Sequence, residues 1–268
     1  MHVTALRIYP VKACRGIALD RAALGRRGLE HDRRWMIVDP EGVFVTQREA
    51  PSLARVAVAI EEDALVLSLP ERGEVRVPLT PRSTHVSRAR MRVRVWKSEV
   101  EAVDCGEPAA HWLGAWLQRP VRLVAMPDDV ERQVSLEHAL PGDIVGFADG
   151  FPLLLTTTAS LDDLNARLAS PVPMDRFRPN IIVDGTSPWE EDGWKRVHIG
   201  GVPLRVAKPC ARCSVPTVDQ GTGERTGAEP LATLATFRQR GHAVLFGQNL
   251  IPDAAGTLAV GDALGVAS

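Results

Sequence analysis

The 268-residue sequence has no long apolar segment. No run approaches the roughly 18 consecutive apolar residues that a membrane helix requires. The first ten residues also contain no apolar stretch of signal-peptide length. We therefore expect a cytoplasmic protein that does not insert into a membrane.

The sequence also lacks an excess of either charge. Lys and Arg number 32 and Asp and Glu number 33, which gives a formal net charge of -1. Such a balance provides no overall attraction to nucleic acid or to an anionic membrane. We expect no nucleic acid polymer among the partners, so any basic binding site must be identified residue by residue.

Cysteine is scarce, with four in the chain. Cys14 and Cys105 stand alone, and four cysteines in a chain of this size do not form a disulfide framework. This pattern is typical of a reducing compartment, in which thiols are available for chemistry.

Short apolar segments bounded by turn residues recur through the chain and predict strands. Residues Asp39–Gly42 predict a hairpin turn between two of them, and Met91–Trp96 alternates apolar and basic residues as a strand with one solvated face does. The strands predicted in the first half are Val3–Ile8, Trp35–Val38, Val43–Thr46, Val56–Ile60, Ala64–Leu69, Glu74–Leu79 and Met91–Trp96. Regular strands of this kind favour a barrel or a sandwich.

Helical periodicity is rarer. Residues Pro108–Leu117 carry an apolar stripe, Ser160–Leu168 is predicted to be a helix capped by Ser160, and a third helix is predicted to begin at Pro230. The charged, turn-rich segment Met126–Gly142 separates the first two helices. We predict a mainly β (α+β) fold with a few helices, in two consecutive domains over residues 1–120 and 121–268.

In the second half, a predicted hairpin leads directly to a pair of cysteines. Its turn is Gly200–Gly201, and its second arm leads to Cys210, which predicts a loop leaving a strand. The strands predicted in this half are Ile181–Val183, Val197–Ile199, Val202–Val206, Thr257–Val260 and Leu264–Val266.

The segment Cys210-Ala211-Arg212-Cys213 offers two thiols with a guanidinium between them. A thiolate beside a fixed positive charge is either a soft-metal ligand or a nucleophile. Structural zinc would need two more Cys or His ligands, and the nearest downstream histidine is His242. A thioredoxin-like pair would need a helix directly after the motif, which Pro216 disfavours, and two inert thiols are a further alternative.

Several short motifs accompany this segment in a characteristic order, and together they resemble the MOSC domain, named for the molybdenum cofactor sulfurase C-terminal region. Other motifs near the amino terminus resemble the MOSC N-terminal β-barrel domain, and the pairing is similar to that of the mitochondrial amidoxime-reducing component and its bacterial relatives. The MOSC motifs are Phe177–Ile181, Trp189–Asp192, Cys210–Cys213, Thr217–Asp219, Thr222–Gly223, Glu229–Leu231 and Phe246–Gln248, and the N-terminal ones are Ile8–Lys12 and Asp32–Trp35.

This resemblance implies a MOSC N-terminal β-barrel domain over residues 1–120 and a MOSC domain over residues 121–268. It implies that Cys213 is the catalytic residue and the molybdenum ligand, whereas Cys210 need not bind the metal. Molybdenum in a pterin dithiolene is a soft centre that favours one protein thiolate.

The molybdopterin carries a phosphate, for which Arg and Lys supply charge-assisted hydrogen bonds. By position in the matching motifs, the cofactor-binding residues are expected to be Lys12, Arg33, Arg178, Asn180 and Arg212. Relatives often have serine after the motif lysine where this chain has Ala13, so we expect one hydroxyl contact to be missing. Because Lys12 and Cys213 come from opposite halves of the chain, the cofactor is expected between the two domains.

The resemblance implies a molybdenum-dependent reductase of small N-hydroxylated compounds: amidoximes, hydroxylamines and N-hydroxy nucleobases. A separate flavoprotein or ferredoxin-type electron donor is expected, because no segment has iron–sulfur ligand spacing. Asp219 lies near the cysteine loop and is a candidate acid, but we favour its interpretation as a turn-capping residue. The alternatives are a non-redox carrier of molybdenum cofactor or sulfur on Cys213, and a structural zinc-binding β protein.

Overall fold

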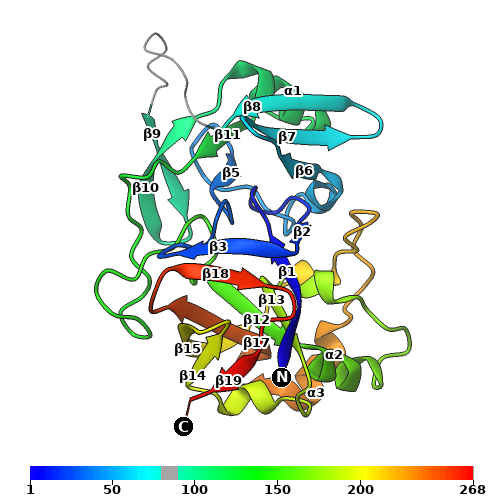
Figure 1. The fold of residues 1–268 in the computed structure, drawn as a ribbon. Coiled ribbons are helices and arrows are strands. Elements are labelled where there is room, and N and C mark those ends of the chain that lie inside the picture. The colour runs from blue at the N-terminus through cyan, green and yellow to red at the C-terminus, as the bar shows by residue number, and fades with distance from the viewer. Residues whose placement is uncertain (80–89, 268) are drawn as a thin grey trace.

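The structure is a computed structural model that describes residues 1–79 and 90–267. Strands dominate these residues, and the three α-helices found in them lie outside the sheets (Figure 1). The predicted mainly β architecture with a few helices is confirmed. The helices are α1 (Glu107–Leu117), α2 (Thr158–Asn165) and α3 (Leu231–Arg238), with 3-10 turns at Pro51–Arg55, Met174–Phe177, Glu190–Gly193 and Val215–Thr217.

The largest sheet curves round until the start of β1 meets the segment before β19. The amide of Val3 donates to the Asp262 carbonyl and the amide of Leu264 donates to the Met1 carbonyl, so β1 reaches the segment that leads into β19. Closure of this kind removes exposed strand edges, as in a barrel. In spatial order the strands are β19 (Leu264–Val266), β14 (Arg196–Ile199), β15 (Val202–Ala211), β17 (Ala243–Pro252), β12 (Leu153–Thr157), β13 (Ile181–Asp184), β1 (His2–Ile8) and β2 (Ile17–Leu19), with β16 (Gln239–Arg240) against β17.

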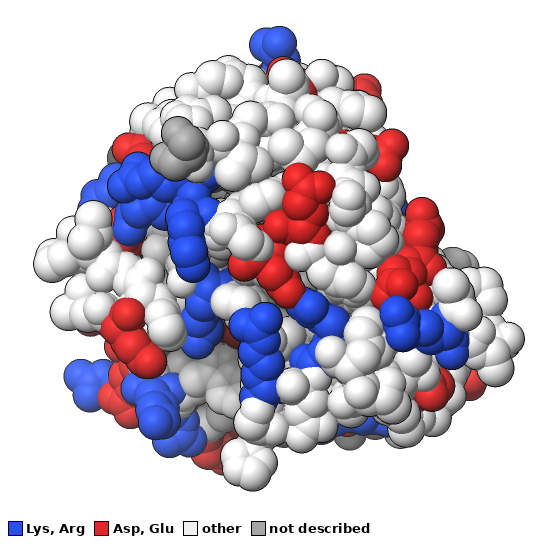
Figure 2. All heavy atoms as spheres, turned by 90° about the horizontal axis from the view of Figure 1, so that it is seen from below, with Lys and Arg blue, Asp and Glu red and all other residues white. Residues whose placement is uncertain are grey.

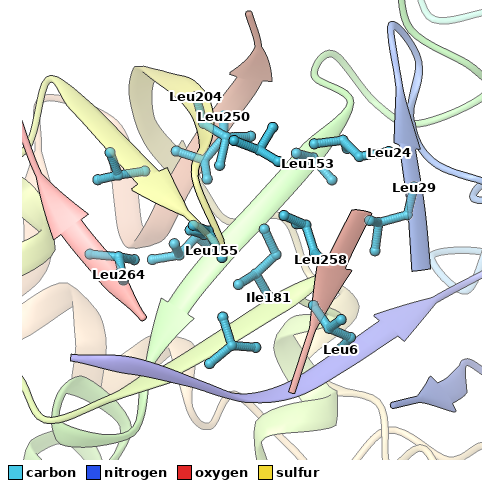
Figure 3. Packing of buried hydrophobic residues seen from close by; sticks show 14 of the residues in the cluster. Leu6, Leu24, Leu29, Leu153, Leu155, Ile181, Leu204, Leu250, Leu258 and Leu264 are labelled. Atoms are coloured by element: carbon cyan, nitrogen blue, oxygen red, sulfur yellow. The ribbon is translucent and has the colours of Figure 1, made fainter. Parts of the chain in front are cut away.

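A small sheet of β18 (Gly256–Ala259), β3 (Arg21–Gly25) and β4 (Gly28–Leu29) packs over this large sheet. Leucines from both converge on one interior, among them Leu155 and Leu258, which are fully buried (Figure 3). Residues 2–29 therefore complete the core of the C-terminal half, with β1 paired to β13 and β3 paired to β18. The division of the chain at residue 120 stays a prediction.

A second β region occupies the other end of the molecule (Figure 1). The segment after β5 links β5 to β9, because Phe44 bridges Val38 and Val43 bridges Arg94. Helix α1 buries Ala109, Ala110 and Leu113, which confirms the predicted stripe. The sheets are β5 (Trp35–Val38), β11 (Arg122–Ala125), β10 (Ser98–Asp104) and β9 (Arg90–Val95), and then β6 (Ala57–Ile60), β7 (Ala64–Leu69) and β8 (Gly73–Pro78).

The strand predicted over Val43–Thr46 is wrong, because this segment makes isolated bridges instead of a continuous ladder. The amide of Val43 donates to the Asp39 carboxylate at 2.8 Å, and the amide of Thr46 donates to the Glu49 carboxylate at 3.1 Å. These two amides therefore donate to side chains and not to the backbone of a neighbouring strand.

Two helix starts and one strand end also differ from prediction. The cap of α2 is Thr157, whose hydroxyl accepts from the Ser160 amide at 3.2 Å, so Ser160 lies inside the helix. Helix α3 begins at Leu231, one residue after Pro230. Strand β15 continues through Cys210, because its backbone keeps pairing with β17 past two irregularities.

Within residues 1–79 and 90–267, no helix has the length and apolar composition needed to cross a membrane.

The shared interior predicts a large stability effect at Leu155. Leu155→Ala removes a fully buried side chain from the central strand β12 and should lower the free energy of unfolding by about 2–5 kcal/mol. Leu140→Ala, at a position 58% exposed, should change it by less than about 0.5 kcal/mol. Urea unfolding followed by circular dichroism measures both, and equal effects would contradict this account of the core.

Candidate functional site

One pocket brings together all the side chains that the sequence predicted as site residues. Its lining combines residues that follow β1, residues around β13 and residues that follow β15, so segments distant in sequence form its wall. The predicted residues in the lining are Lys12, Arg33, Arg178, Asn180, Arg212 and Cys213.

Lys12 is almost completely buried, with 7% of the residue exposed. Its ammonium donates to the Asp149 carboxylate at 2.5 Å and to the Phe147 carbonyl at 2.8 Å, which leaves one of its three N–H donors. Burial lowers the pKa of Lys12, and the Asp149 charge opposes that shift. Burial by itself would raise the pKa of Asp149, but the Lys12 ammonium, the Trp96 hydrogen bond and the Arg48 charge together hold that pKa well below its usual range.

Arg33 and Arg178 lie against the ring of Tyr9. Their guanidinium carbons are 4.4 and 4.2 Å from the ring centroid, a cation–π distance. Burial lowers the pKa of Arg178 to about 10, so the group stays charged at neutral pH. Tyr9 therefore positions two cations beside each other in the pocket.

Strained backbone is concentrated at this pocket. Ala13, Arg33 and Arg178 have φ angles of 72°, 48° and 56°, in the left-handed region that non-glycine residues seldom adopt. All three line the pocket. Strain of this kind is typical of functional sites, where the surrounding structure enforces it.

Asn180 is buried, and its amide is occupied by the fold. The side-chain oxygen accepts from the Leu154 amide and from Arg33, both at 3.1 Å, and the side-chain nitrogen donates to the Arg7 carbonyl at 3.1 Å. Asn180 thus joins β1, β12 and Arg33. Its direct contact with a cofactor stays a prediction.

The two neighbouring cysteines have different surroundings. Arg212 donates to the Cys210 sulfur at 3.1 Å and to the Phe177 carbonyl at 2.8 Å, whereas Cys213 accepts no hydrogen bond from the residues that the structure describes. Both thiols are free and half-buried. Burial raises the pKa of the Cys14 thiol to about 12, so that thiol stays protonated.

A structural zinc site lacks ligands here. Across residues 1–79 and 90–267, no three His, Cys, Asp or Glu side chains are grouped so as to hold a metal ion. Two thiols are half of what a structural zinc site requires. The zinc alternative therefore has no support from the described part of the chain.

The structure adds three residues that sequence reasoning missed. Tyr9 lay inside a quoted motif without an assigned role, and Asp149 and Arg48, which line the pocket, lay outside every motif. Asp219 was interpreted correctly, because its carboxylate accepts from the amides of Gly221 and Thr222 at 2.9 Å.

The pocket has a strongly unequal charge. Its lining carries five cationic side chains, Arg48 included, and one carboxylate, Asp149. On the face shown in Figure 2, by contrast, basic and acidic side chains are intermingled. The Arg212 Nε atom is buried without a hydrogen-bond partner. Unused cationic donors beside a free thiol suit a cofactor that combines a phosphate with a soft metal.

The fold and the site define a MOSC protein with an N-terminal β barrel. Residues 1–120 match the family description "MOSC N-terminal beta barrel domain" and residues 143–265 match "MOSC domain". The chain belongs to this family and is similar over most of its length to mitochondrial amidoxime-reducing components.

The relatives cover most of the chain. The Homo sapiens "Mitochondrial amidoxime-reducing component 1" is 36% identical over 97% of this chain and 81% of its own length. The Bos taurus "Mitochondrial amidoxime reducing component 2" is 36% identical over 88% and 72%. A solved structure, the YuaD protein of Bacillus subtilis, matches over 98% of this chain and 93% of its own length at 12% identity, with a TM-score of 0.44.

The Lys12–Asp149 pair predicts a stability effect with a defined pH dependence. Asp149→Asn leaves a buried ammonium without its counter-charge and should destabilise the protein by about 1–3 kcal/mol at pH 7, less than for a fully buried pair because the Asp149 side chain is 56% exposed. The pKa of Asp149 is depressed in the folded state, so its contribution is complete above about pH 4 and declines as the pH falls further.

Asp128→Asn is the matched control for this measurement. Asp128 pairs with Arg34 at 2.7 Å, but its side chain is 91% exposed, and the change should be below about 0.5 kcal/mol. Urea unfolding between pH 3 and pH 8 tests the pair. An equal loss in both variants, or a loss in Asp149→Asn that does not shrink toward pH 3, would contradict the role of Lys12.

Proposed function

We propose that this protein is an oxidoreductase that uses a molybdenum cofactor to reduce N-hydroxylated compounds, namely amidoximes, hydroxylamines and N-hydroxy nucleobases. In the overall reaction two electrons and two protons are consumed, the N–O bond breaks and water leaves. The observation that carries the proposal is the convergence of Cys213 with cations from both halves of the chain in one pocket. The names of the relatives support the substrate class.

Each residue has a defined task in this proposal. Cys213 would supply one protein thiolate to molybdenum, and the bound cofactor would supply the two-electron chemistry. Lys12, Arg33, Arg178 and Arg212 would hold the phosphate and the pterin through donors that the fold leaves unused. Asn180 holds Arg33 at 3.1 Å, and Cys210 accepts the Arg212 hydrogen bond.

Partial burial strengthens these cations as anion ligands. Hydrogen bonds from a charged donor are roughly twice as strong as neutral ones, and a low local dielectric increases the attraction further. Because Lys12 and Arg178 come from opposite halves, a cofactor held by both would also stabilise the folded chain as a whole. The pocket is therefore suited to retain its cofactor through many turnovers.

We further propose a separate electron donor of the flavoprotein or ferredoxin type, acting in the cytoplasm. The four cysteines of the sequence do not provide iron–sulfur spacing, and the Cys14 thiol is buried and protonated. A non-redox carrier of molybdenum cofactor or of sulfur is the second candidate. It is favoured by the half-buried position of Cys213, which leaves the sulfur open to exchange.

Paired cysteine variants test the proposal. Cys213→Ala and Cys210→Ala change neighbouring thiols in one segment, and each is produced in cells that make molybdenum cofactor. We expect Cys213→Ala to lose most of its molybdenum, because the metal loses its protein ligand. Its rate of benzamidoxime reduction with an artificial electron donor should fall at least about 100-fold. Cys210→Ala should keep more than half of its molybdenum.

Elemental analysis, sulfane-sulfur assay and single-turnover reduction provide the measurements. Wild-type protein with about one molybdenum per chain and reductase activity supports the oxidoreductase. Protein that carries sulfane sulfur on Cys213 and reduces nothing would establish the carrier instead. Retention of both metal and activity in Cys213→Ala would contradict the assignment of Cys213.

A further inference from the structure

An exposed indole stands at the rim of the pocket. Trp96 is 46% exposed, and its ring N–H donates to the Asp149 carboxylate at 3.1 Å. Asp149 lines the pocket and holds Lys12. The indole is therefore fixed to the same carboxylate that organises the interior of the site.

Two further side chains complete this rim. The guanidinium carbon of Arg48 lies 4.1 Å from the Trp96 ring, and the ring of Phe44 lies 5.3 Å away at an interplanar angle of 51°. Arg48 also lines the pocket, and its guanidinium makes no side-chain hydrogen bond or ion pair within the described residues. We name Phe44, Arg48 and Trp96 the aromatic rim.

The backbone at Trp96 adds an independent observation. Trp96 and Lys97 form the two-residue connection between β9 and β10, in which Val95 pairs with Ser98. Trp96 has a φ of 56°, in a turn position where glycine or asparagine is ordinarily favoured. A bulky residue there is strained, and a side chain that stays half exposed recovers little stability from burial. This strain points to a role outside folding.

We propose that the aromatic rim is a substrate subsite, in which Trp96 and Phe44 bind the planar, aromatic part of an N-hydroxylated substrate. The inference rests on the proposed function, because it names the substrate class of that same site. Aromatic rings attract one another in offset or edge-to-face arrangements, and Arg48 stacks on planar groups as readily as on indole. Arg48 belongs both to the rim and to the pocket lining, and Asp149, which also lines the pocket, accepts the Trp96 hydrogen bond. A ring bound on Trp96 therefore lies next to the pocket.

Binding measured apart from turnover tests the subsite. The probes are benzamidoxime and acetamidoxime, which share the reacting group and differ in the ring. Isothermal titration on the cofactor-loaded wild type, Trp96→Ala and Trp96→Phe gives the ratio of the two Kd values. We expect Trp96→Ala to reduce the preference for benzamidoxime about tenfold and Trp96→Phe to retain most of it. Leu136→Ala, 62% exposed and absent from the pocket lining, should leave the ratio unchanged.

Each outcome decides between the alternatives. A benzamidoxime preference that Trp96→Ala removes supports the subsite, whether or not turnover is seen. Equal weakening of both probes, or an unchanged ratio in Trp96→Ala, overturns it. Wild-type protein that binds benzamidoxime through Trp96 but never reduces it, even with an artificial electron donor, would refute the proposed reaction and leave the subsite standing.

Discussion

The pocket depends on holding several cations close together in a partly desolvated space. Two unit charges 4 Å apart repel by about 4 kcal/mol at an effective dielectric constant of about 20. The fold counters this repulsion locally: Asp149 faces Lys12, Asp32 contacts Arg33 at 2.6 Å, and the Tyr9 ring lies against two guanidinium groups. These contacts do not neutralise the positive charge of the pocket, because Asp149 is the one carboxylate in the described lining. The remaining positive charge is what an anionic cofactor would neutralise.

The strands that close the large sheet also position residues of the site. Strand β1 pairs with β13 and carries the chain directly to Lys12, so the position of the ammonium follows from the register of the barrel. Asn180, which precedes β13, donates to the Arg7 carbonyl of β1 and accepts from the Leu154 amide of β12 as well as from Arg33. A register shift of β1 or β13 would displace both the Lys12 ammonium and the Arg33 guanidinium.

Local patterns predicted many of the strands and the stripe of α1, because period and turn chemistry depend on neighbouring residues. They did not predict β10, β11, β12 or β17. The strand prediction for Val43–Thr46 was wrong, because the amides of this segment donate to carboxylates a few residues away. The pocket residues came from motif resemblance, whereas Tyr9, Asp149 and Arg48, and Trp96 at the rim, were missed because their roles depend on distant partners. Lys12 and Asp149 are 137 residues apart, and nothing in the sequence near either position indicates the other.

The two cysteines acquire different properties from a small difference in backbone position. Cys210 still belongs to β15, and its sulfur accepts from Arg212, which in turn donates to the Phe177 carbonyl. Cys213 follows the end of the strand, where its sulfur lines the pocket without a hydrogen bond from the described residues. A thiolate that accepts a charged hydrogen bond is a weaker donor to a metal, because its charge is already partly satisfied. The Cys210 sulfur thus positions Arg212, whereas the Cys213 sulfur has no such contact and could bind a metal.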